Sequence, residues 1–167
     1  MSRRGARWRP DALAAALEVD AAELQVLTQW TPTGDGTVVV PTADVRPSPF
    51  QPRGRPSVGA VAAVADAIAG AGSIAGLVDD PGEEAIRRLP PEARALAELA
   101  ADVAAHGVET PLEVRRVAGG LELLSGHRRL AAARLAGLAT VPVVDRGPIA
   151  DHVAAAIVYR RNLLRKD

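Results

Sequence analysis

Residues 121–137 read Leu-Glu-Leu-Leu-Ser-Gly-His-Arg-Arg-Leu-Ala-Ala-Ala-Arg-Leu-Ala-Gly, and this stretch decides the fold. Its largely apolar start follows a turn at Gly119-Gly120 and predicts a strand. Residues 131–136 are strong helix formers, and Gly137 ends the helix. The stretch therefore predicts a strand, a turn and a helix in succession.

The residues between this strand and helix carry the candidate chemistry. Ser125, Gly126 and His127 stand where the backbone opens the helix, so unbonded N–H groups and the positive end of the helix dipole point outward. Arg128 and Arg129 add two positive charges there. Such an opening predicts a polyphosphate site. The alternative is a solvated helix start whose arginines pair with nearby acids.

Further segments occur in a specific order along the chain. They are Phe50-Gln51-Pro52-Arg53, residues 96–100, residues 107–114, the Ser125 to Arg129 segment, and residues 162–167. This order resembles the N-terminal domain of ParB-type partition proteins, which belongs to the ParB/sulfiredoxin family. The resemblance runs from about residue 38 to residue 167, with an insertion. It implies an α/β (α+β) domain, a small mixed sheet with packed helices, over residues 37–167.

The resemblance also implies a function and a site. ParB-type proteins bind CTP and close as clamps on DNA, so the chain is expected to support partition of a bacterial chromosome or plasmid. The implied nucleotide-binding residues are Gln51, Arg53, Gly107, Thr110, Pro111, Ser125, Gly126, His127, Arg128, Arg129, Asn162 and Arg165. Gln51 and Arg53 are placed beside the phosphates, although their proline-rich loop also suits a surface connector. Residues 107–111 are placed under the cytosine, and Asn162 is the implied Mg²⁺ ligand.

Three positions depart from the family pattern. Arg161 replaces a glutamate that helps to ligate the metal, and Mg²⁺ does not accept a cation as a ligand. His127 replaces a glutamate linked to hydrolysis, and Ala131 replaces an arginine of the phosphate grip. We therefore expect CTP binding with weak CTP hydrolysis or none, and a weak dependence on Mg²⁺.

Other activities on the same fold were weighed against this one. Sulfiredoxin chemistry is excluded because Gly126 stands at the position of the catalytic thiol and the chain has no cysteine. The three histidines, His106, His127 and His152, lack acidic ligands at metal-site spacing. A small-molecule kinase or nuclease-like enzyme and a degenerate, non-hydrolysing interaction scaffold remain as alternatives.

The composition favours one folded domain whose core is filled by small aliphatic side chains. Of the 167 residues, 48% are hydrophobic but only 2% are aromatic, so alanine, valine and leucine must fill the interior. The absence of cysteine suits a reducing compartment. No apolar run reaches the roughly 18–20 residues that span a bilayer. We expect a cytoplasmic, nucleoid-associated protein that does not enter membranes.

Charge is concentrated at the two ends of a chain whose formal net charge is zero. Residues 1–9 carry Arg3, Arg4, Arg7 and Arg9 and are expected to form a flexible basic tail. The tail is either a solubilising end or, as the resemblance implies, the contact for a ParA-type ATPase. Residues 10–36 predict a helical extension with Leu13, Leu17, Leu24 and Leu27 on one face.

The remaining elements follow in order. Residues 37–40 predict a strand, the prolines of residues 41–56 predict a loop without regular structure, and residues 58–89 predict a helical insertion. A helix from Pro91 ended by Gly107, strands near 112–117 and 141–144, and a final helix at 149–164 complete the domain.

The resemblance also implies partners. The chain is expected to self-associate as a homodimer on nucleotide binding. In ParB-type proteins a helix-turn-helix domain that reads DNA follows the box at residues 162–167, and this sequence ends at Asp167. We therefore expect an N-terminal portion, or a member without its reader, that binds DNA weakly and without sequence preference.

Overall fold

The structure, a computed structural model, describes residues 36–50 and 55–164, with the backbone alone at 80–81 and 162–164. Its centre is a five-stranded mixed sheet in the order β1-β5-β3-β4-β2. The strands are β1 (Thr37–Pro41), β2 (Val45–Arg46), β3 (Leu112–Val117), β4 (Gly120–Ser125) and β5 (Thr140–Pro148). β1 pairs antiparallel with β5 and β3 with β4, whereas β3–β5 and β2–β4 are parallel. The α/β prediction is confirmed.

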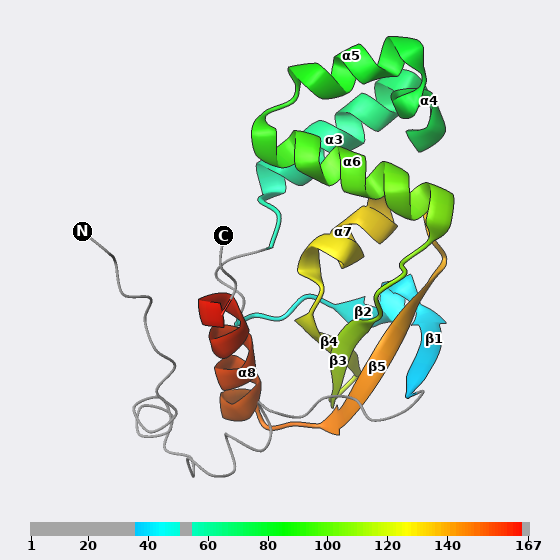
Figure 1. Cartoon of the computed structure of the whole chain (residues 1–167). Coiled ribbons are helices and arrows are strands. Elements are labelled where there is room, and N and C mark those ends of the chain that lie inside the picture. Colours follow the sequence, from blue (N-terminus) through cyan, green and yellow to red (C-terminus); the bar gives the residue numbers. More distant parts are fainter. Residues whose placement is uncertain (1–35, 51–54, 165–167) are drawn as a thin grey trace, which may run out of the picture.

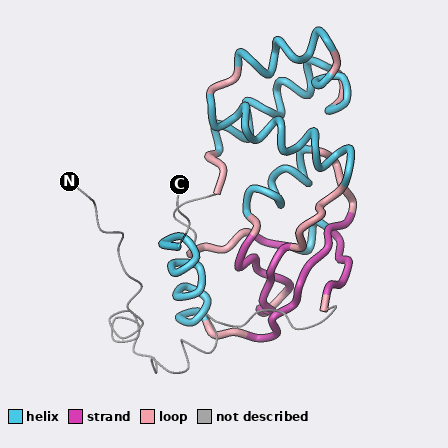
Figure 2. The backbone as a smooth tube through the Cα atoms, viewed as in Figure 1, coloured by secondary structure: helices cyan, strands magenta, loops and turns pink. Residues whose placement is uncertain are grey.

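The helices divide into two groups (Figures 1 and 2). A stack above the sheet contains α3 (Val58–Ala71), α4 (Ile74–Val78), α5 (Asp80–Arg88), α6 (Pro91–His106) and α7 (His127–Leu135). The last helix, α8 (Asp151–Leu164), lies beside the sheet and apart from the stack. No helix in the described part of the chain is long and apolar enough to cross a membrane.

Local signals explain where the stacked helices begin and end. The Ser57 hydroxyl accepts a hydrogen bond from the Ala60 amide at 3.1 Å and caps the start of α3. Glu92, in the first turn of α6, accepts from both the amide and the hydroxyl of Ser57. Pro91 begins α6, and Gly107, with φ of 77°, ends it as predicted.

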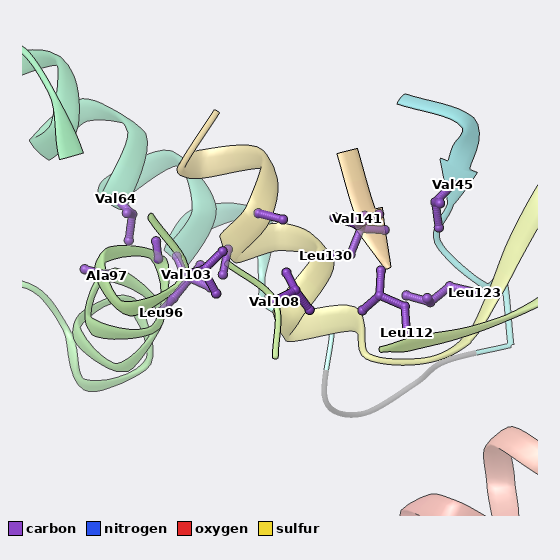
Figure 3. Packing of buried hydrophobic residues seen from close by; sticks show 14 of the residues in the cluster. Val45, Val64, Leu96, Ala97, Val103, Val108, Leu112, Leu123, Leu130 and Val141 are labelled. Carbon is purple, nitrogen blue, oxygen red and sulfur yellow. The ribbon is translucent and has the colours of Figure 1, made fainter. Parts of the chain in front are cut away.

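One apolar core joins the helical stack to the sheet (Figure 3). Leu112 and Leu123 from the sheet, Leu130 from α7 and Leu96 from α6 are almost completely buried in it. Alanines such as Ala97, Ala100 and Ala132 let the helices approach closely. Residues 58–88 are helical, and they contribute to this same core through Val64, Leu77 and Ile86.

Three predicted boundaries were wrong. Residues 41–46 are regular despite their prolines, because Pro41 ends an edge strand, where a missing amide loses little, and a 3-10 turn at Thr42–Asp44 leads into β2. β5 extends to Pro148, beyond the apolar run 141–144, because polar residues continue the pairing with β3. α8 begins at Asp151 rather than at residue 149. Residues 1–35 lie outside the described residues, so the predicted division into a tail, an extension and a domain stays a prediction.

Candidate functional site

Gly126 forms the turn between β4 and α7. Its φ of 105° lies in the left-handed region that favours glycine. A Cβ at this position would lie 2.5 Å from Cδ2 of Leu112, so any larger residue would displace a core side chain. Because Leu130 makes the first amide bond back to the Gly126 carbonyl, the amides of residues 127–129 stand at the open first turn of α7.

Arg129 connects this first turn to the loop that follows α6. Its Nη1 donates to the carbonyls of Thr110 and Pro111, the latter at 2.8 Å. The loop therefore lies against the start of α7, although residues 107 and 126 are distant in sequence. The sequence predicted both groups as site residues, and the structure brings Thr110 and Pro111 to the α7 opening through Arg129, while Gly107 ends α6. This positioning role of Arg129 was not predicted.

Arg128 provides the exposed cation of the opening. Among the described residues it forms no hydrogen bond or ion pair. Its field reaches Glu92, whose pKa lies below the usual value chiefly because the amide and hydroxyl of Ser57 donate to it, with a smaller contribution from Arg128. Arg128 is thus the guanidinium at this site that a bound anion would engage with the least rearrangement.

His127 is buried, although it lies at a helix start that was expected to be exposed. It is only 6% exposed, and its Nε2 accepts a hydrogen bond from the Ser48 amide at 3.2 Å. The Ser48 hydroxyl in turn accepts from the Phe50 amide. His127 therefore fastens the start of the proline-rich loop to α7. Gln51 and Arg53, predicted in that loop, lie outside the described residues.

A cavity of about 440 Å³ opens beside the same helix. It lies between α7, the start of α3 and the two ends of the proline-rich loop, with Leu130, Ala131 and Val61 among its apolar lining. Arg55 and Arg134 bring cations to it. Arg134 also donates to the Val45 carbonyl at 2.7 Å. The volume lies within the range of small-molecule sites.

A partly buried ion cluster connects α8 to the end of β4 that leads into α7. One oxygen of Glu113 accepts from Nη2 of Arg146 and of Arg161, each at 2.6 Å. Burial of Glu113 alone would raise its pKa, but the hydrogen bonds and charges of Arg161 and Arg146 together lower it below the usual value. Since Glu113 pairs with Ser125 across the strands, Arg161 is brought near the predicted site.

The described residues do not form a Mg²⁺ site by themselves. Mg²⁺ needs oxygen ligands in octahedral geometry. Within the described residues no group of three histidine, cysteine, aspartate or glutamate side chains converges. Glu113, which lies near the site, is engaged by two guanidiniums. The predicted ligand Asn162 is described in its backbone alone, and Arg165 lies outside the described residues.

Sequence reasoning missed Ser48, Glu113 and Arg146. Charged residues alternate with buried Leu112 and Val114 along β3, and this alternation was a usable signal that the second face of the sheet is polar. No local sequence pattern identified the residues on β5 and α8 that pair with these charged residues of β3. The same holds for Ser48, whose partner His127 is 79 positions away.

Comparison with protein families identifies the domain that these residues build. The model of the ParB N-terminal domain matches residues 28–163. The chain belongs to the ParB N-terminal domain family. The matched range contains the α7 opening, the loop tied by Arg129 and the helices of residues 58–88.

Several curated relatives of this ParB N-terminal domain are named as partitioning proteins. A probable chromosome 2-partitioning protein ParB of Deinococcus radiodurans is 50% identical over 70 residues, 42% of this chain and 24% of the relative. Stage 0 sporulation protein J of Bacillus subtilis is 42% identical over 73 residues, 44% of this chain and 26% of the relative. Spo0J of Thermus thermophilus, a chromosome-partitioning protein, is 32% identical over 135 residues, 81% of this chain and 37% of the relative. The chain thus spans about a quarter to a third of their length.

A solved structure also resembles it. This is the C-terminally truncated chromosome-partitioning protein ParB from Caulobacter crescentus, complexed with CTP-gamma-S. It is 23% identical, with a TM-score of 0.47, and the match covers 80% of this chain and 56% of that chain.

Proposed function

We propose that this chain is the nucleotide-binding module of a ParB-type partition protein and that it binds CTP at the open first turn of α7. The observation that carries the proposal is the junction at Gly126, where a tight left-handed turn exposes helix amides and Arg129 holds the 107–111 loop against them. Amides at a helix start and an exposed Arg128 suit the phosphates. The backbone groups of the loop are proposed to contact the base.

The proposal is tested by titrating CTP, ATP and GTP into the full chain in a calorimeter. We expect CTP to bind most tightly. Arg128→Ala removes a charge-assisted phosphate contact and should weaken CTP binding by about 1.5–3 kcal/mol, roughly ten- to over a hundredfold. The matched control is Arg88→Ala, an exposed arginine on α5 outside the site. Equal affinity in both variants would place the phosphates elsewhere.

Hydrolysis is expected to be slow or absent. Arg161, proposed above to stand at a metal-ligand position, is engaged with Glu113, and His127 holds Ser48, so neither supplies a carboxylate. A phosphate-release assay with and without Mg²⁺ measures this directly. A rapid, Mg²⁺-dependent rate would contradict the expectation.

The remaining parts of the proposal concern partners. We propose that CTP binding promotes self-association into a homodimer that supports clamp formation on DNA in the cytoplasm, close to the nucleoid. Arg3, Arg4, Arg7 and Arg9 are proposed to contact a ParA-type ATPase. We propose that sequence-specific DNA reading is carried by a helix-turn-helix domain, as in ParB-type proteins. The isolated chain should therefore bind specific and scrambled duplexes equally, weakly and only at low salt, which an anisotropy titration measures.

A further inference from the structure

A second concave surface lies away from the α7 opening, between α4, α5 and α6. We call it the acidic groove, and its volume is about 840 Å³. Four carboxylates line it, from Asp79, Glu83, Glu98 and Asp102, together with two guanidiniums, from Arg87 and Arg94. The groove is built mainly from residues 74–106, and none of its lining residues belongs to the proposed CTP site.

The cations of the acidic groove are already engaged, whereas some of its anions are not. Arg87 pairs with Glu83 at 3.2 Å, and Arg94 donates to the carbonyls of Arg87 and Leu89. In contrast, Asp79 and Glu98 form no hydrogen bond or ion pair with any described side chain. The groove therefore offers unneutralised carboxylates to a cationic ligand.

The floor of the acidic groove is apolar. Ala101, Ala104 and Ala105 of α6 form a shallow surface, with Ile74 and Val78 of α4 beside them. Val78 is 50% exposed, although large apolar side chains usually gain free energy by leaving water. A ligand that fits both features carries positive charges around a large apolar side chain. An aromatic ring flanked by arginines has this chemistry.

The chain itself contains such a segment. Residues 3–9 read Arg-Arg-Gly-Ala-Arg-Trp-Arg, so four arginines accompany Trp8. We propose that this N-terminal segment docks in the acidic groove of its own chain, with Trp8 over the alanine floor and its arginines at Glu98 and the neighbouring carboxylates. Contacts of exposed arginines with carboxylates are weak and sensitive to salt, so docking is reversible and leaves the segment available to a partner.

The connection to the first strand is long enough for this contact. Residues 10–36 separate the segment from β1. If residues 10–29 form the predicted helix, it spans about 30 Å. The other residues add roughly 24 Å when extended. A compact domain of this size has a radius of gyration of about 14 Å, so the segment reaches any face of it.

The two tryptophans of the chain, Trp8 and Trp30, make the proposal measurable in the full-length protein. In a Trp30→Phe background Trp8 is the sole reporter. We expect its emission to be shifted to the blue, and its quenching by acrylamide to be several-fold weaker, relative to a synthetic peptide of residues 1–12. Adding Glu98→Lys, which reverses an exposed charge of the groove, should return both values to those of the peptide. The control Asp66→Lys, at an exposed position on α3 outside the groove, should change neither.

Salt and dilution complete the test. About 1 M NaCl shortens the Debye length to roughly 3 Å, and it should expose Trp8 in the parent to the level of Glu98→Lys. Peptide-like emission of Trp8 in the parent at low salt overturns the proposal. A blue shift of Trp8 emission that persists in Glu98→Lys would place Trp8 at another site. A blue shift that disappears on dilution would place Trp8 on a second copy of the chain. Either result also overturns the proposal.

Discussion

The two faces of the sheet are covered in different ways. On one face, Leu112, Val114 and Leu123 pack against the helical stack in an apolar core. On the other face, Glu113 and Arg115 form ion pairs with α8, in which Ile157 and other apolar residues are also buried. Arg115 is only 2% exposed, yet it contacts Glu122, Asp151 and the Ile149 carbonyl, and it lies 5.7 Å from the centroid of the Phe50 ring.

The two faces therefore illustrate two kinds of stabilisation, apolar burial and ion pairs between specific groups. Apolar burial stabilises the stack without fixing individual partners, because the hydrophobic effect is non-directional. Ion pairs specify which groups meet, but their contribution depends on ionisation and on both partners being present. The position of α8, which carries Arg161 and Asn162, is therefore set by directed ion pairs together with burial of its apolar side, whereas the position of α7 is set mainly by packing.

The largest expected effect tests the charged face directly. Arg115→Met leaves Glu122 without its main partner in a mostly buried position. Breaking a buried pair from one side costs about 3–5 kcal/mol. The neighbouring Arg116, whose side chain is 66% exposed, is the matched control, and Arg116→Met should cost less than about 1 kcal/mol. Urea unfolding measures both, and equal losses would contradict the distinction between buried and exposed pairs.

The next effect tests the packed face at the site. Both Gly126 and Gly137 have positive φ, so alanine at either position costs about 1–2 kcal/mol in backbone strain. Only Gly126→Ala also forces a Cβ against Leu112. Overpacking of this kind adds about 1–3 kcal/mol. We therefore expect the larger loss of stability, and the loss of CTP binding, in Gly126→Ala. Equal losses would mean that the opening is less tightly packed than the structure indicates.

Acid should loosen α8 before it loosens α6. In the folded protein the pKa of Glu113 lies below its usual value of 4.5, because its burial is outweighed by the hydrogen bonds and charges of Arg161 and Arg146. Its stabilising contribution is therefore fully present above about pH 4.5 and is lost as the pH falls through the lower, folded value. Hydrogen exchange should show faster opening of α8 amides than of α6 amides in that acidic range. In Glu113→Gln this additional dependence of α8 on pH should disappear, and its persistence would assign the effect to another group.

The smallest effect is expected at the outer edge of the stack. Glu84 and Arg88 pair at 3.2 Å on α5, but their side chains are 55% and 77% exposed. Solvent screens such pairs, so Glu84→Gln should change the free energy of unfolding by about 0.5 kcal/mol or less. A thermal melt compared with that of Arg115→Met gives the contrast. A loss comparable to that of Arg115→Met would show that burial does not determine the strength of ion pairs in this protein.

The elements of the packed face could be predicted from sequence. The apolar and alanine-rich pattern of residues 121–137 specified β4, the turn and α7, and Pro91 and Gly107 bounded α6. These signals are local, because helix and strand periodicity and glycine conformation act within a few residues. The residues at the α7 opening were predicted for the same reason.

The charged face could not be predicted in the same way. Glu113 and Arg161 are 48 positions apart, and Arg115 and Ile149 are 34 apart. A side chain's partner across such distances depends on how the sheet folds, which no local pattern encodes. β2 was missed for a related reason, since it is two residues long and is defined only by its pairing with β4.

The central claim is that CTP binds at the open first turn of α7. Amide chemical shifts of the ¹⁵N-labelled chain during a CTP titration test it most directly. The account predicts saturable shifts that are largest at residues 126–130 and 107–111, with α5 unchanged. An unchanged spectrum, or shifts concentrated on α4 and α5, would contradict it.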